Sequence, residues 1–353
     1  MTSGAARSAA RRPLRIGVLG GSGQIGRCLL RAIAEAEDLA LAFAPSRAEL
    51  DLEALDRIEP WLDAARPVGG GAAADVVVNA AAFTRVDACE REVELAGRLN
   101  ARMPTAWAQA LVRRGVRFVH LSSDYVFSGE ADRPYREEDA TAPRSVYGES
   151  KRAGEVGVLG ADPSARVVRT SWVFGPGRNF VAAILEQAWK RRMGEATDPI
   201  RVVDDQRGRP TAAGDLADAL LALCRRGTDD ARGFPALLHL ANAGETTWYG
   251  FARAILAQSG FGDVAIEPVS TGAFPTAAPR PAWSVLDTRR AEALGIRMRP
   301  WTDALAGYLA GPDRPTRLAP DRGGRVSAHA GGTGSADGEP DRAPESDRRK
   351  ASH

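Results

Sequence analysis

The chain has 353 residues, 44% of them apolar, and a formal net charge of +2, so it is long enough to bury one large core or two modest ones. So small a net charge excludes a nucleic-acid-binding surface over the whole molecule, and we expect no nucleic-acid partner. The three cysteines and four histidines show no ligand spacing, which predicts buried thiols in a reducing compartment and no transition-metal site.

The N-terminal residues 1–13 are basic and rich in small residues, but they lack the apolar stretch of a signal peptide. No apolar run approaches the roughly 20 residues that a membrane-spanning helix needs. We therefore expect a flexible N-terminal extension, no membrane partner and a cytoplasmic location.

The first predicted elements are a strand at Leu14–Leu19, a glycine-rich turn (GGSGQIG) and a helix at Arg27–Ala36. In this setting Gly20 permits the turn, Gly23 lets the backbone approach a pyrophosphate, and Gly26 lets helix and strand pack closely. The N-terminus of the helix then faces the phosphates. The turn therefore predicts a dinucleotide site, and a purely structural turn is the alternative.

The second predicted strand, Leu39–Ala44, ends without the acidic residue that would accept the adenosine ribose 2′-hydroxyl. Ser46 and Arg47 stand there instead and could hold a 2′-phosphate. The sequence thus favours NADPH over NADH, although NADH stays possible. The alternative for Arg47 is a solvated cation on a loop.

Strands and helices continue to alternate to about residue 170. The further expected strands and helices are Asp75–Asn79, Val116–Ser122 and Ala165–Arg169, and Leu52–Ala65, Glu92–Arg114 (interrupted near Pro104) and Val146–Gly154. The unbroken β-branched core of Asp75–Asn79 is typical of a buried parallel strand. This alternation predicts an α/β fold with a Rossmann-type doubly wound parallel sheet in residues 14–170.

Beyond residue 171 the rhythm is less regular. Helices are expected at Phe180–Arg191, Ala213–Arg225 and 286–310, with a strand at Leu237–Leu240 and a helix at Trp248–Gln258 behind a cap at Thr246 or Thr247. We expect residues 171–310 to form a smaller C-terminal substrate-binding lobe, interleaved with the sheet domain. Residues 311–353 contain almost no large apolar side chains, which predicts a disordered tail.

Tyr147 and Lys151 lie four residues apart, on one face of the helix that begins at Val146. A tyrosine hydroxyl titrates near pH ~10 in water. A neighbouring ammonium lowers that pKa, so the pair could act as an acid/base device for a carbonyl or an alcohol. The alternative is chance spacing on an ordinary helix.

Ser123 follows a core strand, at the edge of the sheet where ligands bind in folds of this kind. Its hydroxyl is placed to hydrogen-bond a substrate oxygen. The alternative is that Ser123 and Asp124 only cap or turn the chain.

Eight stretches spread in order over roughly residues 14–310 resemble the extended short-chain dehydrogenase/reductases, and within them the dTDP-4-dehydrorhamnose reductase family. The stretches are Gly20–Gly26, Val77–Asp87, His120–Phe127, Val146–Glu155, Arg169–Gly175, Val202–Thr211, Gly244–Ile255 and Arg280–Asp287. Such an ordered series is far more specific than any single motif.

The resemblance implies a role for each matching residue. Tyr147 would protonate the sugar C4 oxygen, Lys151 would bind the nicotinamide ribose and lower the pKa of Tyr147, and Ser123 would orient the carbonyl. The cofactor would be held by Gly20, Gly23, Gln24, Ile25, Gly26, Ser46, Arg47, Asp51, Leu52, Ala80, Ala81, Ala82, Tyr147 and Lys151. The sugar nucleotide would contact Ser123, Asp124, Tyr125 and Trp172; core packing is the alternative for Trp172.

The implied reaction is the NADPH-dependent reduction of the C4 keto group of dTDP-4-dehydro-β-L-rhamnose to dTDP-L-rhamnose. One alternative is a related 4-ketoreductase of antibiotic deoxysugar or dihydrostreptose assembly, because stereochemistry depends on the shape of the pocket and not on the shared motifs. Arg207 and Arg209 are unusually basic for their loop, which indicates a phosphorylated or nucleotide ligand or a compositional bias and leaves the sugar open. Another is a non-catalytic NADP-binding regulatory subunit. Some related reductases are dimers with a magnesium ion at the interface, so monomer or homodimer and the Mg²⁺ question both stay open.

Overall fold

A computed structural model describes residues 12–65, 72–226 and 234–315, all within one compact unit. The predicted N-terminal extension lies outside the described residues up to position 11, and so does the predicted disordered tail from position 316 onward. The expectations for those segments stay predictions.

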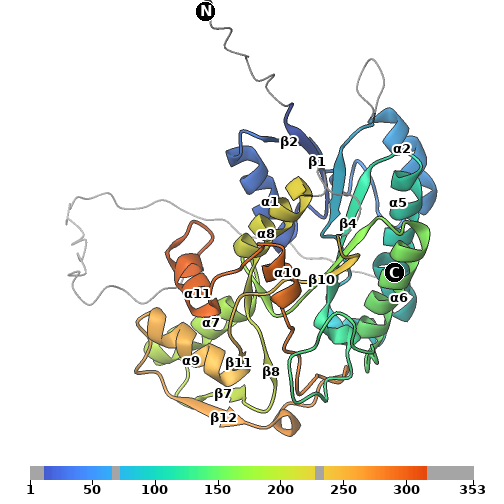
Figure 1. Cartoon of the computed structure of the whole chain (residues 1–353). Coiled ribbons are helices and arrows are strands. Elements are labelled where there is room, and N and C mark those ends of the chain that lie inside the picture. Colours follow the sequence, from blue (N-terminus) through green and yellow to red (C-terminus); the bar gives the residue numbers. More distant parts are fainter. Residues whose placement is uncertain (1–11, 66–71, 227–233, 316–353) are drawn as a thin grey trace, which may run out of the picture. The chain divides into compact units, whose positions relative to one another are not determined.

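The centre of the fold is a six-stranded parallel sheet (Figure 1). Its strands are β1 (Leu14–Leu19), β2 (Leu39–Phe43), β3 (Val76–Asn79), β4 (Arg117–Ser123), β5 (Arg166–Thr170) and β10 (Leu237–His239). In the order β2-β1-β3-β4-β5-β10 the chain places β2 on one side of β1 and then continues with β3 on the other side. The doubly wound α/β fold is thus confirmed, and its switch point, where such sheets bind ligands, lies at the carboxyl ends of β1 and β3.

Helices cover both faces of the sheet (Figure 1). Helices α1 (Gln24–Glu35) and α8 (Ala213–Arg226) pack on one face, and α2 (Ile58–Ala64), α5 (Met103–Val112) and α6 (Val146–Ala161) pack on the other. Successive residues of a strand point to opposite faces of the sheet. In β3, Val76 and Val78 enter the core beneath α1 and α8, and Val77 enters the core beneath α5 and α6. This double burial explains the unbroken apolar strands of the sequence.

A π-helical turn interrupts the long helix that was expected to break near Pro104. The chain runs through α4 (Val93–Gly97), the π turn η2 (Arg98–Arg102) and then α5, which has Pro104 in its first turn. The buried side chain of Asn100 in the π turn accepts a hydrogen bond from the Phe83 amide at 2.7 Å and donates to the Phe83 carbonyl at 3.0 Å. The interruption is therefore a fixed bulge, of the kind often found at functional sites.

The second lobe is built from helices and short strand pairs around an aromatic core. Its elements are β6 (Val173–Phe174), α7 (Phe180–Arg192), β7 (Ile200–Val203), β8 (Arg207–Gly208), β9 (Thr211–Ala212), β11 (Thr246–Thr247), α9 (Trp248–Gln258), β12 (Ile266–Val269) and α11 (Trp301–Ala310). As expected, α9 has a threonine cap: the Thr247 hydroxyl accepts from the Gly250 amide at 3.0 Å. Helix α8 packs on the sheet and β10 is one of its strands, so the chain returns to the sheet after the second lobe has begun. The predicted domain limits stay a prediction.

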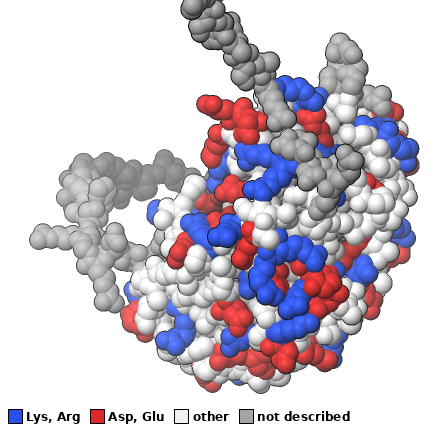
Figure 2. Space-filling view, viewed as in Figure 1, with Lys and Arg blue, Asp and Glu red and all other residues white. Residues whose placement is uncertain are grey.

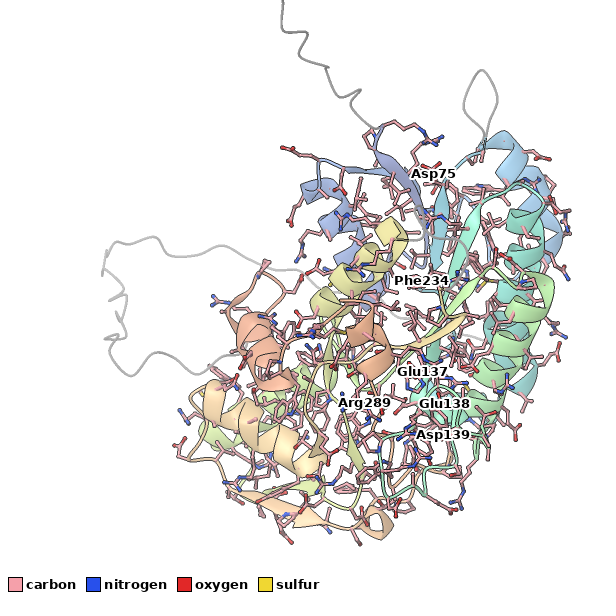
Figure 3. The ribbon with its side chains drawn as sticks, viewed as in Figure 1. Asp75, Glu137, Glu138, Asp139, Phe234 and Arg289 are labelled. Carbon is pink, nitrogen blue, oxygen red and sulfur yellow. The ribbon has the colours of Figure 1, made fainter. Side chains whose placement is uncertain are left out.

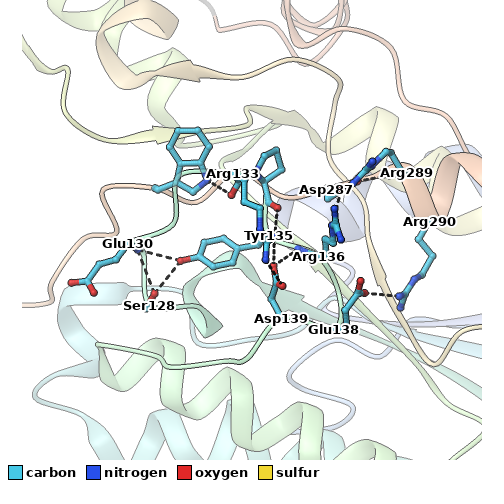
Figure 4. Close-up of polar contacts among 12 residues, drawn as sticks. Ser128, Glu130, Arg133, Tyr135, Arg136, Glu138, Asp139, Asp287, Arg289 and Arg290 are labelled. Atoms are coloured by element: carbon cyan, nitrogen blue, oxygen red, sulfur yellow. Dashed lines mark hydrogen bonds and ion pairs between the residues drawn. The ribbon is translucent and has the colours of Figure 1, made fainter.

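The segment from residue 278 to residue 288, here called the crossing segment, ties the loops of the sheet to the second lobe. Backbone hydrogen bonds join Tyr135 to Val285 and Asp287, at 2.8 and 2.7 Å. Figure 3 shows Glu137, Glu138 and Asp139 on the facing loop, and Figure 4 shows the ion pairs nearby, including Arg290 with Glu138 and Arg289 with Asp287. The crossing segment brings Ser284 and Arg280 to the carboxyl end of the sheet.

The surface carries acidic and basic side chains interspersed over the face shown in Figure 2. No helix within the described ranges is long and apolar enough to cross a membrane.

We expect Gly154→Ala to destabilise the fold, because a Cβ at this position would lie 2.2 Å from the Asn100 carbonyl oxygen. Overpacking against backbone should lower the free energy of unfolding by about 2 kcal/mol. Gly160 is the matched control: it lies on the same helix with nothing within 4 Å of its Cβ, so Gly160→Ala should raise that free energy by roughly 0.5–1 kcal/mol. Urea unfolding measures both, and equal shifts of the same sign would contradict the close contact.

Candidate functional site

A pocket of about 650 Å³ opens at the switch point of the sheet. It is lined by the glycine turn after β1, the loop after β2 and the loop after β3. The predicted cofactor residues in its wall are Gly20, Gly23, Ser46, Arg47, Asp51, Leu52, Ala80, Ala81 and Ala82. The structure therefore gathers around one cavity most of the residues that the sequence assigned to a dinucleotide.

Each of the three positions in the turn needs a glycine for a different physical reason. Gly20 has a φ of +78°, and a Cβ there would lie 2.7 Å from the Ala81 amide nitrogen, while a Cβ on Gly26 would lie 2.1 Å from the Gly20 carbonyl oxygen. The packing of the protein itself thus requires both. A Cβ on Gly23 would meet only the Gly20 oxygen, at 3.3 Å. The absence of a side chain at Gly23 therefore matters for the pocket, because it lets a ligand approach the backbone.

The N-terminus of α1 is open to an anion. Its cap residue, Gly23, supplies no side-chain hydrogen bond, and the first turn contains no acidic residue. The unpaired N–H groups and the helix dipole therefore favour a negatively charged ligand at the edge of the pocket. Gln24 donates from its side chain to the Arg178 carbonyl of the second lobe at 2.8 Å, and the Ile25 side chain packs into the core, so only the Ile25 backbone could face a phosphate.

Carboxylates surround the cation at the far end of the pocket. Arg47 is 80% exposed and pairs with Glu53 at 3.2 Å and with Asp51 at 3.8 Å, while the Ser46 hydroxyl donates to Glu49 at 2.8 Å. A phosphate bound by Arg47 would have to replace these acids as its partner. Exposed ion pairs are weak, so the replacement would cost little free energy.

The loop after β3 is held by two buried residues that the sequence analysis missed. Asn79 accepts a hydrogen bond from the Ala81 amide at 3.0 Å, and its side-chain nitrogen lies 3.0 Å from Nδ1 of His120. Both side chains are fully buried. Burial keeps the pKa of His120 low, so the ring is neutral and can accept from Asn79. In the sequence, the only feature that indicates this support of the loop is an asparagine at the very end of an apolar strand.

The three predicted catalytic residues lie together at the carboxyl end of β4. The Tyr147 hydroxyl hydrogen-bonds Ser123, and Nζ of Lys151 donates to the Leu121 carbonyl at 2.6 Å. Helix α6 starts one residue before Tyr147, where the Ser145 hydroxyl accepts from the Gly148 amide at 3.2 Å. All three side chains are nearly buried, so they form a small, dry constellation beside the pocket.

The pKa of Tyr147 differs from the sequence expectation. Burial raises the pKa of its hydroxyl above the ordinary value, and the hydrogen bond with Ser123 only partly opposes that rise. The expected lowering by Lys151 is not found: after burial and the hydrogen bond with Ser123, the remaining influences are the charges of Asp124, Tyr125 and Cys89, which raise the pKa further. Burial also lowers the pKa of Lys151 to about 8, against the opposing attraction of Glu155.

Asp124 and Tyr125 lie in the same buried turn. Asp124 is 3% exposed, and burial raises its pKa to about 6. Tyr125 packs edge-to-face on Tyr147, with ring centroids 5.4 Å apart. Arg280 of the crossing segment hydrogen-bonds Tyr125 and pairs with Asp87 at 2.6 Å, so the crossing segment closes over this turn.

Trp172 occupies the side of the site that faces the second lobe. It follows Thr170, the register partner of Ser123, by two residues. Its φ of 47° is left-handed, which is costly for a large residue and points to a functional constraint. Its ring stacks on Trp248 with centroids 3.6 Å apart, and a Cβ on Gly208 would lie 2.4 Å from it.

The acidic pair Asp204 and Asp205 is engaged in local turns. Asp205 accepts from the Thr271 amide at 2.9 Å, and Asp204 accepts from the Thr247 hydroxyl at 2.5 Å. Of the two basic residues nearby, Arg207 pairs with Glu245 at 3.2 Å and Arg209 bonds Thr288 at 3.2 Å. In the part of the chain that the structure describes, no group of three or more His, Cys, Asp or Glu side chains could hold a metal ion.

Comparisons with known proteins converge on one family. Residues 14–312 match the family model of the RmlD substrate binding domain. The chain is 40% identical over 316 residues to a dTDP-4-dehydrorhamnose reductase of Mycobacterium tuberculosis, covering 87% of this chain and 96% of that protein. It is 39% identical over 307 residues to a probable dTDP-4,6-dihydroxy-2-methyloxan-3-one 4-ketoreductase of Streptomyces antibioticus, covering 85% and 97%.

A solved structure is similar over the same region. It is a dTDP-4-dehydrorhamnose reductase of Bacillus anthracis in complex with NADP, 29% identical, with a TM-score of 0.73 and coverage of 84% of this chain and 99% of that one.

We expect Gly208→Ala to displace the Trp172 ring, because the new Cβ would overlap the indole. The stacked pair of Trp172 and Trp248 should give a coupled near-ultraviolet circular dichroism signal that this variant loses. Gly214→Ala, in a helix with nothing within 4 Å of the new Cβ, is the control and should keep the signal. A retained signal in Gly208→Ala would show that the ring does not rest against residue 208.

Proposed function

Because the chain belongs to the family of the RmlD substrate binding domain, we propose that it is an NADPH-dependent reductase of a dTDP-linked 4-keto-6-deoxy sugar. The most specific form of this proposal is the reduction of dTDP-4-dehydro-β-L-rhamnose to dTDP-L-rhamnose. The observation that carries it is the buried contact between Tyr147 and Ser123 beside a pocket with a dinucleotide-binding turn.

The pocket suits a nicotinamide dinucleotide by its shape and chemistry. Gly23 leaves room for a diphosphate next to the uncapped N-terminus of α1, and the loop after β3 reaches toward the catalytic constellation. A relative of known structure binds NADP. When bound, the cofactor supplies the hydride, and every proton movement is left to the side chains of this chain.

Tyr147 is the proton donor in this proposal. Its hydroxyl is buried and its pKa lies above the ordinary value, so it holds its proton until a developing alkoxide of higher basicity takes it. Ser123, the neighbour of Tyr147, helps in this proposal to stabilise the charge that develops on the substrate oxygen. Lys151 contributes a buried amine whose pKa, about 8, keeps it mostly cationic at neutral pH. Asp124, Tyr125 and Trp172 form the proposed sugar-nucleotide wall.

A second candidate function has nearly equal support. The Streptomyces antibioticus relative acts by its name as a 4-ketoreductase on a different dTDP-linked sugar, and its identity to this chain, 39%, is within one percentage point of the Mycobacterium tuberculosis relative. Both activities use the same proton donor, so the wall around Trp172 has to choose the sugar. A non-catalytic regulatory subunit would have no need of the intact Ser123, Tyr147 and Lys151.

We infer the cellular location of the protein from its proposed cofactor. A reaction that consumes NADPH fits the cytoplasm, where we place it, and a monomer or a homodimer would serve this chemistry equally.

We expect the purified protein to oxidise NADPH when dTDP-4-dehydro-L-rhamnose is added, and Tyr147→Phe to lower kcat by about 10²–10⁴-fold without changing the fold, because only the hydroxyl is lost. Absorbance at the NADPH band measures the rate, and circular dichroism checks the fold. Wild-type inactivity on this sugar and on related dTDP-4-keto sugars, with tight NADPH binding, would favour the regulatory alternative. Full activity of Tyr147→Phe would remove Tyr147 from the chemistry.

We expect Arg47→Ala to weaken NADPH binding about tenfold and to leave NADH binding unchanged, because only NADPH carries the 2′-phosphate. Arg98→Ala is the matched control: Arg98 also pairs with Glu53, at 3.7 Å, but does not line the pocket. Fluorescence titration gives the two dissociation constants. Equal losses for both cofactors would mean that Arg47 only supports the loop.

A further inference from the structure

We propose that the amino-terminal edge of the sheet carries a second binding site, which takes a carboxylate on a short apolar body. The site is a cavity of about 120 Å³, at the edge of the sheet opposite the cofactor pocket. None of the residues assigned to the proposed reductase function lines it, so the inference does not depend on that function. Its wall includes Val76, Arg117, Val119, Arg166, Leu223 and Phe234.

The strand register places two arginines in one wall. Arg117 is the first residue of β4 and Arg166 is the first residue of β5, and Val119 is the register partner of Arg166. Residues two apart on a strand share a face of the sheet, as do register partners on neighbouring strands. All three side chains therefore project from the face that α8 covers, and the charge of Arg117 acts on Arg166.

Neither arginine forms an ion pair with any residue that the structure describes. Arg117 donates from Nη1 to the Cys224 carbonyl at 2.8 Å, whereas its Nη2 is buried and has no hydrogen-bond partner. Arg166 donates from Nη1 to the carbonyls of Ser164 and Ala165, at 2.5 and 3.1 Å. Buried donors are nearly always satisfied, because leaving one without a partner is costly. The remaining guanidinium N–H groups are therefore available to a ligand.

The electrostatics of this wall favour an anion. Burial lowers the pKa of Arg166 from its ordinary value, and the charge of Arg117 lowers it further, although the charge of Asp162 opposes both. Asp162 does not neutralise the pair, because its Oδ1 is engaged by the Ser164 amide and hydroxyl at 2.8 and 2.6 Å. A carboxylate between two guanidinium groups would relieve their repulsion and accept charge-assisted hydrogen bonds.

The rest of the cavity suits a short apolar body. Val76 and Val119 line it from the sheet and Leu223 from α8, while the ring of Phe234 (Figure 3) lies 5.6 Å from the guanidinium carbon of Arg166. An engineered apolar cavity of roughly 150 Å³ holds benzene. A cavity slightly smaller than that suits a branched chain of about four or five carbons, and isovalerate combines such a chain with a carboxylate.

A purely structural role accounts for only part of this arrangement. Arg117 supports the last turn of α8 through the Cys224 carbonyl, as basic residues near helix C-termini often do. Arg166 makes no such contact with the helix, and it is half-buried without an acidic partner among the described residues. Arg166 is therefore the residue to vary, since its loss leaves the end of the helix supported.

The test is calorimetric titration of the NADPH-saturated protein with isovalerate at constant ionic strength. NADPH keeps the cofactor pocket and Arg47 occupied. We expect isovalerate to bind at one site per chain. Isovaleramide has the same shape without the charge, and acetate has the charge without the branched body, so each should bind at least about tenfold more weakly.

The variants locate the site. Arg166→Gln should weaken isovalerate binding at least about tenfold, with circular dichroism to check the fold. Arg201→Gln is the matched control and should bind like the wild type. Arg201 also lies over a phenylalanine ring, that of Phe274 at 5.4 Å, and has no acidic partner in the described part of the chain, but it does not line the cavity.

Four outcomes would overturn the proposal. They are no binding of isovalerate, equal binding of isovaleramide or acetate, unchanged affinity in Arg166→Gln, and an equal loss in Arg201→Gln. Failure of the proposed reductase function is a separate result, because it would appear as absent turnover of dTDP-4-keto sugars and would leave the comparison of these variants as it is.

Discussion

Two backbone contacts of helix α6 fix the site. A Cβ on Gly148 would lie 2.2 Å from the Tyr125 carbonyl oxygen, and a Cβ on Gly154 would lie 2.2 Å from that of Asn100. No side chain fits at either distance, so the helix can approach the end of β4 on one side and the π turn on the other only because both residues are glycines. Tyr147 and Lys151 lie beside and between these two contacts. Their positions are therefore set by backbone packing, which is far stiffer than side-chain packing.

The same close approach determines the electrostatics. Tyr147, Lys151 and Asp124 are all buried where α6 meets the end of β4, and this desolvation moves each pKa toward the neutral form of its group. The site thus keeps a neutral phenol, a weakly basic amine and a weakly acidic carboxyl group within one small volume. The pKa values of Lys151 and Asp124 approach one another, whereas that of Tyr147 moves away from both, so the phenol keeps its proton in the resting site.

Much of this could be predicted from the sequence, because its signals are local. The glycine turn, the apolar strands and the pair Tyr147 and Lys151 lie within short windows, and the parallel sheet is confirmed. The structure also brings Ser123, Tyr147 and Lys151 together at the carboxyl end of β4, while their roles stay predictions. Contacts between distant segments were not predictable: Asp87 binds the Ala278 amide 191 residues away. Periodicity identified the Asn100 helix but not its π turn, and helical spacing identified the pair Tyr147 and Lys151 but not the burial that sets the pKa of each.

In the proposed reductase the choice of sugar would fall to the wall around Trp172, which is assembled from segments distant in the sequence. Trp172 has a strained backbone, its ring lies between Trp248 and the bare Gly208, and Trp248 is held in turn by a hydrogen bond of 3.1 Å to Gln206. A wall supported at so many points cannot adapt freely, so in the proposed function it would select a substrate by shape. Two sugars that differ only in ring substituents present the same carbonyl to Tyr147 but different edges to this wall. Trp172, Gly208 and Trp248 all lie within stretches that resemble the family, so enzymes for both sugars can share these residues, and the choice between the sugars would then depend on how the lobes pack around them.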